Sequence, residues 1–221
     1  MKYLLIHGYG IGLQYSFFKS AEGENAGFGA FDDLIIVGEA KIFRWEIAHK
    51  LSFRESINLR LNIKQYDIEM LKTENQEVYD SLQKELESTK PEIIVCHSAG
   101  SSLLLNYLTN HILPPSVKKI VFIQSNISRN RLFPEYLQAK LQKKEIKLIN
   151  LYCYWDQALW SLILIGRHIS IGLFGSKNTY VKNIFFPLYK TLNLHTSSIN
   201  DIKIFPFIEG RNALQETIYS I

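Results

Sequence analysis

Four short apolar runs constrain the fold of this chain more than any other feature of its sequence. They are Tyr3–Ile6, Ile93–Cys96, Ile120–Ile123 and Ile146–Tyr154. A strand that is apolar along its length is buried on both faces, which is typical of a parallel sheet between two layers of helices. Segments with helical spacing of apolar residues lie between the runs. The alternation predicts an α/β fold with a mostly parallel central sheet and helices on both faces.

The remaining segments complete this pattern. We expect a short helix over 12–19, loop over 20–33, a surface helix over 66–88, and further helices over 101–112 and 135–144. One more strand is expected somewhere in 34–45, an alternating edge strand over 57–64 and a last strand near 181–186. We interpret 1–221 as a single domain with an insertion near 38–66, since no repeat or linker divides it.

Composition excludes several classes of protein. The 221 residues are 47% apolar and 21% charged, which is typical of a globular domain and excludes a disordered chain. The formal charge of +4 is too small to indicate a nucleic-acid partner, although it does not oppose contact with anionic lipid. Neither cysteine, Cys96 or Cys153, has the spacing of a metal ligand, so no metal is expected.

The cysteines and the N-terminus bear on location. We interpret Cys96 and Cys153 as buried thiols in a reducing compartment, although one bridge between them is the alternative. The apolar run after Met1 is too short for a signal peptide. The most apolar stretch, 158–175, carries Arg167 and His168 in its middle, which disfavours a transmembrane span. We therefore expect a cytoplasmic protein.

The segment Cys96-His97-Ser98-Ala99-Gly100 is the strongest candidate for a chemical site. It joins an apolar strand to a helix that starts with small residues. A sharp strand-to-helix turn lifts its middle side chain above the sheet edge and needs small residues two before and two after. Gly100 meets that need, and Cys96 replaces the glycine that is usual at the other position. Ser98 is therefore a candidate nucleophile.

The strand, the His-Ser-Ala-Gly turn and the helix resemble the nucleophile elbow of the α/β-hydrolase superfamily. Ile6-His7-Gly8-Tyr9-Gly10 is similar to the His-Gly loop after an early strand of these enzymes. The resemblance implies an oxyanion hole formed by the backbone amides of Tyr9 and Ala99. The resemblance covers the element order of nearly the whole chain. The chain lacks the first two strands and the lid of larger members, so the resemblance implies a minimal version of that fold.

The resemblance also implies a base and an acid, in the chain order Ser, acid, His. His195 follows the last strand and is the candidate base. Asp156 follows the run that ends at Tyr154 and is the candidate acid. Some members place the acid one strand earlier, but the loop over 124–130 holds no acidic residue. Asp201 is the alternative acid, and a solvated helix-capping aspartate is the alternative role of Asp156.

Together these residues predict a serine hydrolase that acts on an ester or a related acyl bond without a cofactor. Its substrate would be a small acyl compound, apolar if 158–175 forms an acyl pocket. The same stretch could instead touch a membrane peripherally or pack on the sheet. Two other hypotheses stay open: a catalytically silent binding module of the same fold, and a cysteine enzyme that uses Cys96.

Overall fold

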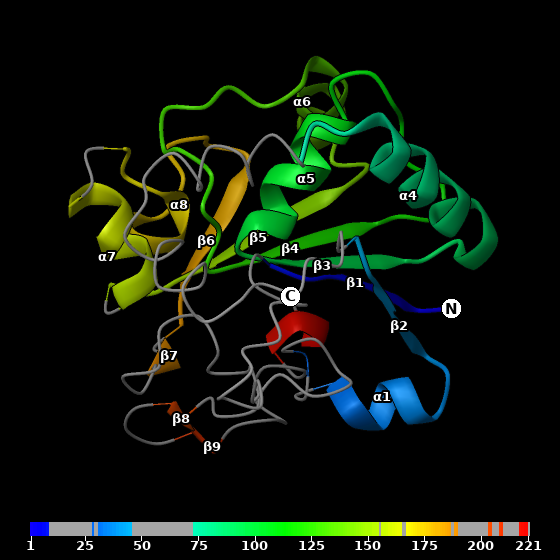
Figure 1. Ribbon diagram of the computed structural model, residues 1–221, viewed down its shortest axis with the longest axis horizontal. Coiled ribbons are helices and arrows are strands. Elements are labelled where there is room, and N and C mark those ends of the chain that lie inside the picture. Colours follow the sequence, from blue (N-terminus) through cyan, green and yellow to red (C-terminus); the bar gives the residue numbers. More distant parts are fainter. Residues whose placement is uncertain are drawn as a thin grey trace, which may run out of the picture.

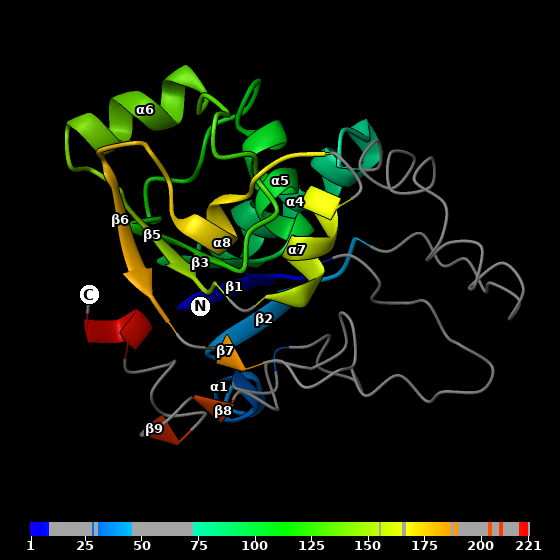
Figure 2. The ribbon, with the colours of Figure 1, turned by 90° about the vertical axis from the view of Figure 1, so that its left-hand side faces the viewer.

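The fold was analysed in a computed structural model, which describes residues 1–8, 28, 31–45, 73–154, 156–164, 167–186, 188–189, 203–204, 208–209 and 217–220. A six-stranded sheet in the order β2-β1-β3-β4-β5-β6 runs through the molecule, and all its strands are parallel (Figures 1 and 2). The strands are β1 (Tyr3–Ile6), β2 (Ala40–Phe43), β3 (Ile93–His97), β4 (Lys119–Ile123), β5 (Lys147–Tyr152) and β6 (Val181–Phe185). The expected α/β class is confirmed, with a sheet that is parallel throughout.

Helices cover both faces of this sheet, as Figure 1 shows. Those on the upper side are α4 (Gln76–Thr89), α5 (Ala99–Tyr107), α6 (Glu135–Gln142), α7 (Gln157–Leu164) and α8 (Ile171–Phe174). Helix α1 (Asp32–Ile36) and the helical residues 217–220 lie on the lower side. A small antiparallel sheet, which the sequence did not predict, consists of β7 (Leu188–Tyr189), β8 (Lys203–Ile204) and β9 (Ile208–Glu209).

Alternate residues of each strand supply two separate cores, which is why the strands read as continuous apolar runs. On β3, Ile94 and Cys96 join one cluster with Leu82 of α4 and Leu103 of α5. The intervening strand residues Ile93 and Val95 join the other cluster, with Phe28, Phe31 and Ile218. The central strands are thereby buried from both sides.

Element boundaries differ from the sequence expectations in a few places. Residues 34–36 belong to α1, and the strand expected within 34–45 is confined to β2 after a turn at Gly38, whose φ is +75°. Helix α5 ends at Tyr107 rather than near 112. The apolar stretch 158–175 holds most of α7 and all of α8. The helix expected over 12–19 and the strand expected over 57–64 lie outside the described residues.

Two further observations concern the described residues only. None of their helices is both long enough and apolar enough to cross a membrane. Cys96 and Cys153 are both buried and are not joined in a disulfide, which agrees with the prediction of buried thiols.

Candidate active site

Ser98 occupies a sharp turn between β3 and α5, where the sequence predicted a nucleophile elbow. Its φ of 47° and ψ of −118° lie outside the regions that non-glycine residues favour. Such backbone strain persists only where the surroundings enforce it, and it is concentrated at functional sites. The backbone N–H of Ser98 donates to the carbonyl of Ile123 on β4 (3.0 Å), and Ser101 donates through its amide (3.1 Å) and its hydroxyl to the carbonyl of Ser98.

The turn is possible because glycines line it. A Cβ atom on Gly100 would lie 2.5 Å from the carbonyl oxygens of both Ile6 and His7. The first turn of α5 therefore passes directly over the end of β1. A Cβ on Gly8 would lie 2.9 Å from the Cβ of Ser98, so Gly8 packs directly against the candidate nucleophile. Both close approaches need the glycines that stand there.

Asp156, the candidate acid, follows β5 at the carboxyl edge of the sheet, where Ser98 also lies. Strands β3 and β5 flank β4, which places their axes about 10 Å apart. The side chain of Asp156 is 1% exposed, and its Oδ1 accepts from the backbone N–H of Leu159 (3.1 Å) in α7. It is thus a helix cap, but a buried one rather than the solvated cap that was the alternative.

A cap and a catalytic acid are compatible roles for Asp156, because a carboxylate has two acceptor oxygens. Of the other expected site residues, Ala99 is the first residue of α5, where backbone N–H groups have no intrahelical acceptor. Tyr9, His195 and the alternative acid Asp201 lie outside the described residues. The structure therefore brings Ser98, Ala99 and Asp156 to one edge of the sheet and does not test the base.

Cys96 is unsuited to nucleophilic chemistry. Its side chain is fully buried in the core beneath α5, and burial raises the pKa of the thiol well above its ordinary value. The thiolate is the reactive form of cysteine, so this environment disfavours it. The structure thus argues against a cysteine enzyme that uses this residue.

His7 secures the loop after β1. Its ring stacks on Trp45 with 5.3 Å between the ring centroids, and its Nδ1 donates to the carbonyl of Gly8 (2.7 Å). Nε2 accepts from the backbone N–H of Trp45 (3.3 Å), and the indole N–H donates to the carbonyl of His7 (3.1 Å). Burial, with a smaller contribution from Arg44, lowers the pKa of His7 to about 4 against the opposing effect of the bond to Gly8. His7 is therefore a neutral structural residue.

The sequence analysis did not single out Gln124, which directly follows β4. Its side chain is 3% exposed, its φ is +47°, and its Oε1 accepts from Nε2 of His97 (3.2 Å), the residue before the nucleophile. Ser125 and Asn126 are buried beside it. The sequence offered one signal for Gln124, Ser125 and Asn126, namely that three polar residues directly follow an apolar strand.

His168 is a second histidine at this edge. It is partly buried, and its Nε2 donates to the carbonyl of Asn126 (2.6 Å), in the loop after β4. In the sequence it lies inside the apolar stretch 158–175. Its position makes it the natural comparison for His195 in mutational tests.

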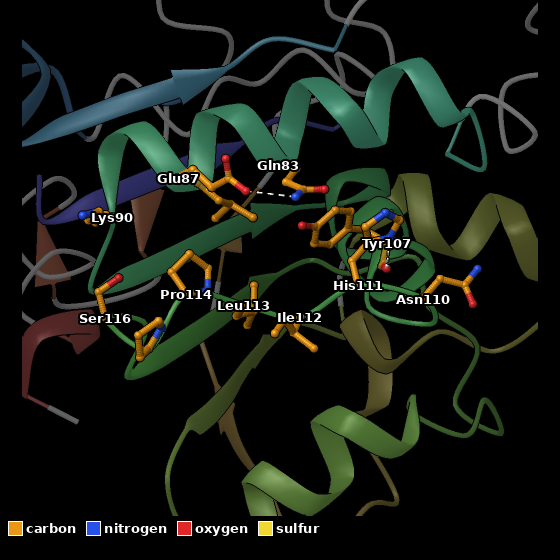
Figure 3. A pocket seen from close by; sticks show the side chains of 12 residues that line it. Gln83, Glu87, Lys90, Tyr107, Asn110, His111, Ile112, Leu113, Pro114 and Ser116 are labelled. Carbon is orange, nitrogen blue, oxygen red and sulfur yellow. Dashed lines mark hydrogen bonds between the residues drawn. The ribbon is translucent and has the colours of Figure 1, made fainter.

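A cavity of about 680 Å³ lies elsewhere, between α4 and the segment that follows α5 (Figure 3). Tyr107 and His111, whose rings stack at 4.4 Å, face Glu87 of α4 across it. Tyr107 ends the helix that starts after Ser98, about 13 Å away along the axis. The cavity is therefore separate from the candidate active site.

Among the described residues, no cluster of His, Cys, Asp or Glu could hold a metal ion.

No protein-family model, no curated protein and no solved structure matches this chain. The inference of function therefore depends on the geometry described above.

We expect Gly100→Ala to lower the free energy of unfolding by about 2 kcal/mol or more, because its Cβ would press on the carbonyls that end β1. Urea denaturation measures the loss. Ser81→Ala on the exposed face of α4 is the control and should stay within about 0.5 kcal/mol of the native protein. Equal stability of the two variants would contradict the close approach of α5 to β1.

We expect the free energy of unfolding of the native protein, relative to that of His7→Gln, to fall by about 2 kcal/mol from pH 7 to pH 5. Folded His7 stays neutral down to about pH 4, whereas unfolded His7 takes up a proton below about pH 6.5. The unfolded state therefore binds more protons in this range, and acid favours it. Urea denaturation of both proteins across the range is the measurement, and a constant difference would contradict a neutral, buried His7.

Proposed function

We propose that this chain is a serine hydrolase of the α/β-hydrolase type, an esterase or a similar acyl hydrolase. The observation that carries the proposal is the backbone of Ser98, with φ 47° and ψ −118°, between a central parallel strand and a helix. A nucleophile elbow needs this strained strand-to-helix turn to expose the hydroxyl at the sheet edge. Tight glycine contacts on both sides of the turn support the same role.

In the proposed reaction, Ser98 attacks the acyl carbonyl, and His195 takes the hydroxyl proton and returns it to the leaving group. Asp156 orients His195 and stabilises its charged form. The backbone amides of Ala99 and Tyr9 stabilise the oxyanion, each with about 3 kcal/mol. Water then releases the acyl group, and the chemistry needs no cofactor. The buried position of Asp156 at the edge that carries Ser98 supports its part in this scheme.

The proposed substrate is a small apolar acyl compound rather than a nucleic acid. Exposed apolar side chains of α7, among them Trp160 and Leu164, support this choice because they follow Asp156 directly. We propose a cytoplasmic location, supported by Cys96 and Cys153, which are not joined in a disulfide and which a reducing compartment would keep as thiols. A binding module of the same fold without catalysis is the competing proposal.

Ser98→Ala should abolish labelling by a fluorophosphonate probe and lower kcat by at least about 10³-fold, because no other group would form the acyl intermediate. Gel fluorescence and hydrolysis of nitrophenyl esters are the measurements. Cys96→Ala is the matched control and should keep both labelling and activity. Absence of labelling in the native protein would favour the non-catalytic binding module.

Asp156→Asn separates catalysis from helix capping, since asparagine caps a helix about as well as aspartate. We expect the free energy of unfolding to change by less than about 0.5 kcal/mol, while kcat falls by about 10³-fold to 10⁴-fold. Ester hydrolysis and urea denaturation measure the two effects. Full activity of this variant would show that Asp156 serves only as a cap.

The same assay compares the two histidines. His195→Ala should be as inactive as Ser98→Ala, whereas His168→Ala should retain activity because its proposed role is only to bond the carbonyl of Asn126. The reverse result would move the base to His168.

A further inference from the structure

Five aromatic rings form a continuous cluster where β5 and β6 end. The ring centroid of Tyr152 lies 5.4 Å from that of Tyr154 and 5.7 Å from that of Phe185. The ring centroid of Tyr154 lies 5.2 Å from that of Phe185 and 5.7 Å from that of Phe174. Trp160 of α7 joins through an edge contact with Phe174 (5.7 Å). These distances lie in the range of favourable ring packing, so the cluster is a connected surface rather than scattered side chains.

Three of these rings remain substantially exposed: Tyr154 at 42%, Trp160 at 40% and Phe185 at 39%. We call Tyr154, Trp160 and Phe185 the aromatic surface. The indole N–H of Trp160 donates to the carbonyl of Tyr154 (2.7 Å), which fixes that ring. The surface therefore presents apolar ring faces, while the indole N–H of Trp160 keeps its hydrogen bond within the protein.

Exposed aliphatic side chains extend this surface along α7 and beyond. Leu164, at the end of α7, is 83% exposed, and Ile169, just before α8, is 47% exposed. Figures 1 and 2 show α7 and α8 side by side at the same end of the molecule. Contiguous exposed apolar residues of this kind mark an interaction site.

Two positively charged side chains, Arg129 and Arg167, lie near the aromatic surface. From residue 146 to residue 186 the acidic side chain is Asp156 alone, and it is buried. Arg167 in the same stretch is exposed and follows α7, whereas Lys147 and Lys182 lie at the starts of β5 and β6, at the opposite edge of the sheet. Arg129 adds a further positive charge, since its Nε donates to the carbonyl of Gly175 (3.0 Å), next to Phe174.

Tryptophan and tyrosine favour the boundary between water and lipid, and basic side chains favour anionic headgroups. A mixture of exposed rings, exposed aliphatic groups and positive charge thus has the chemistry of a peripheral lipid-binding surface. A protein partner would not require the surface to lack acidic side chains. The lack of any exposed acidic side chain from 146 to 186, together with Arg129 and Arg167, favours anionic lipid as the occupant.

We propose that the aromatic surface, with Leu164 and Arg167, docks this protein on an anionic lipid surface. The surface lies at the carboxyl edge of the sheet, the edge at which Asp156 and Ser98 also lie. Docking would therefore place that edge next to the lipid. The inference names a partner for the proposed hydrolase but does not depend on its catalysis.

Sedimentation with vesicles tests the proposal. The full chain should bind vesicles of phosphatidylcholine and phosphatidylserine, at about three to one, at least about tenfold more tightly than vesicles of phosphatidylcholine alone. High salt should weaken the binding. Trp160→Ser and Leu164→Ser should each reduce binding by about tenfold, and Arg167→Gln by about fivefold.

Matched controls lie on other parts of the molecule. Ile36→Ser replaces a side chain that is 81% exposed at the end of α1, and Lys84→Gln removes an exposed charge from α4. Both should bind as the native protein does. Ser98→Ala should also bind fully, so that a failed hydrolase proposal leaves this one intact. Thermal unfolding of each variant excludes misfolding as the cause of a loss.

Two results would overturn the proposal. One is absence of binding to the anionic vesicles, or binding that the Trp160, Leu164 and Arg167 substitutions leave unchanged. The other is a native dimer that dissociates in Trp160→Ser, which would assign the aromatic surface to self-association.

Discussion

The site depends on the contact between the first turn of α5 and the end of β1. Strands β1 and β3 are adjacent and parallel, so the chain leaving β3 must turn sharply over the end of β1. Gly100 makes this possible, because its missing side chain leaves room for the carbonyls of Ile6 and His7. The strained φ of Ser98 is the local consequence of that crossing. Core packing on both sides of β3 holds the strand in place and maintains the strain.

Buried polar residues in the loop after β4 connect the turn at Ser98 to the other segments at the carboxyl edge of the sheet. Ser101 and Ser102 of α5 bond Ser125 (2.6 Å) and Asn126 (2.8 Å) through their side chains. His168 donates to the carbonyl of Asn126, and the amide of Gly172 donates to Ser125 (3.0 Å). The α7–α8 segment is thereby joined to the helix of the nucleophile. A buried network of this kind is stabilising because its polar groups are paired.

Much of the fold could be predicted from sequence because its signals are local. The runs 3–6, 93–96 and 120–123 are strands, since a continuous apolar run suits a strand that is buried on both faces. The helix Ile171–Phe174 could not be predicted in the same way. Its position depends on Asn150, whose amide donates to the carbonyl of Ile171 (2.8 Å) and to Asn183 of β6 (3.1 Å). Such pairings join residues far apart in the chain and leave no periodic pattern.

The sequence by itself determined the parallel α/β class and the turn at Ser98, because both follow from neighbouring residues: apolar runs, small residues and Gly100. Tertiary structure decided what surrounds that turn. It gave Asp156 a buried cap position, brought Gln124 to His97 and gathered Tyr154, Trp160 and Phe185 into one exposed surface. These arrangements depend on which strand ends meet at the carboxyl edge, and strand order is a property of the whole sheet rather than of any one segment.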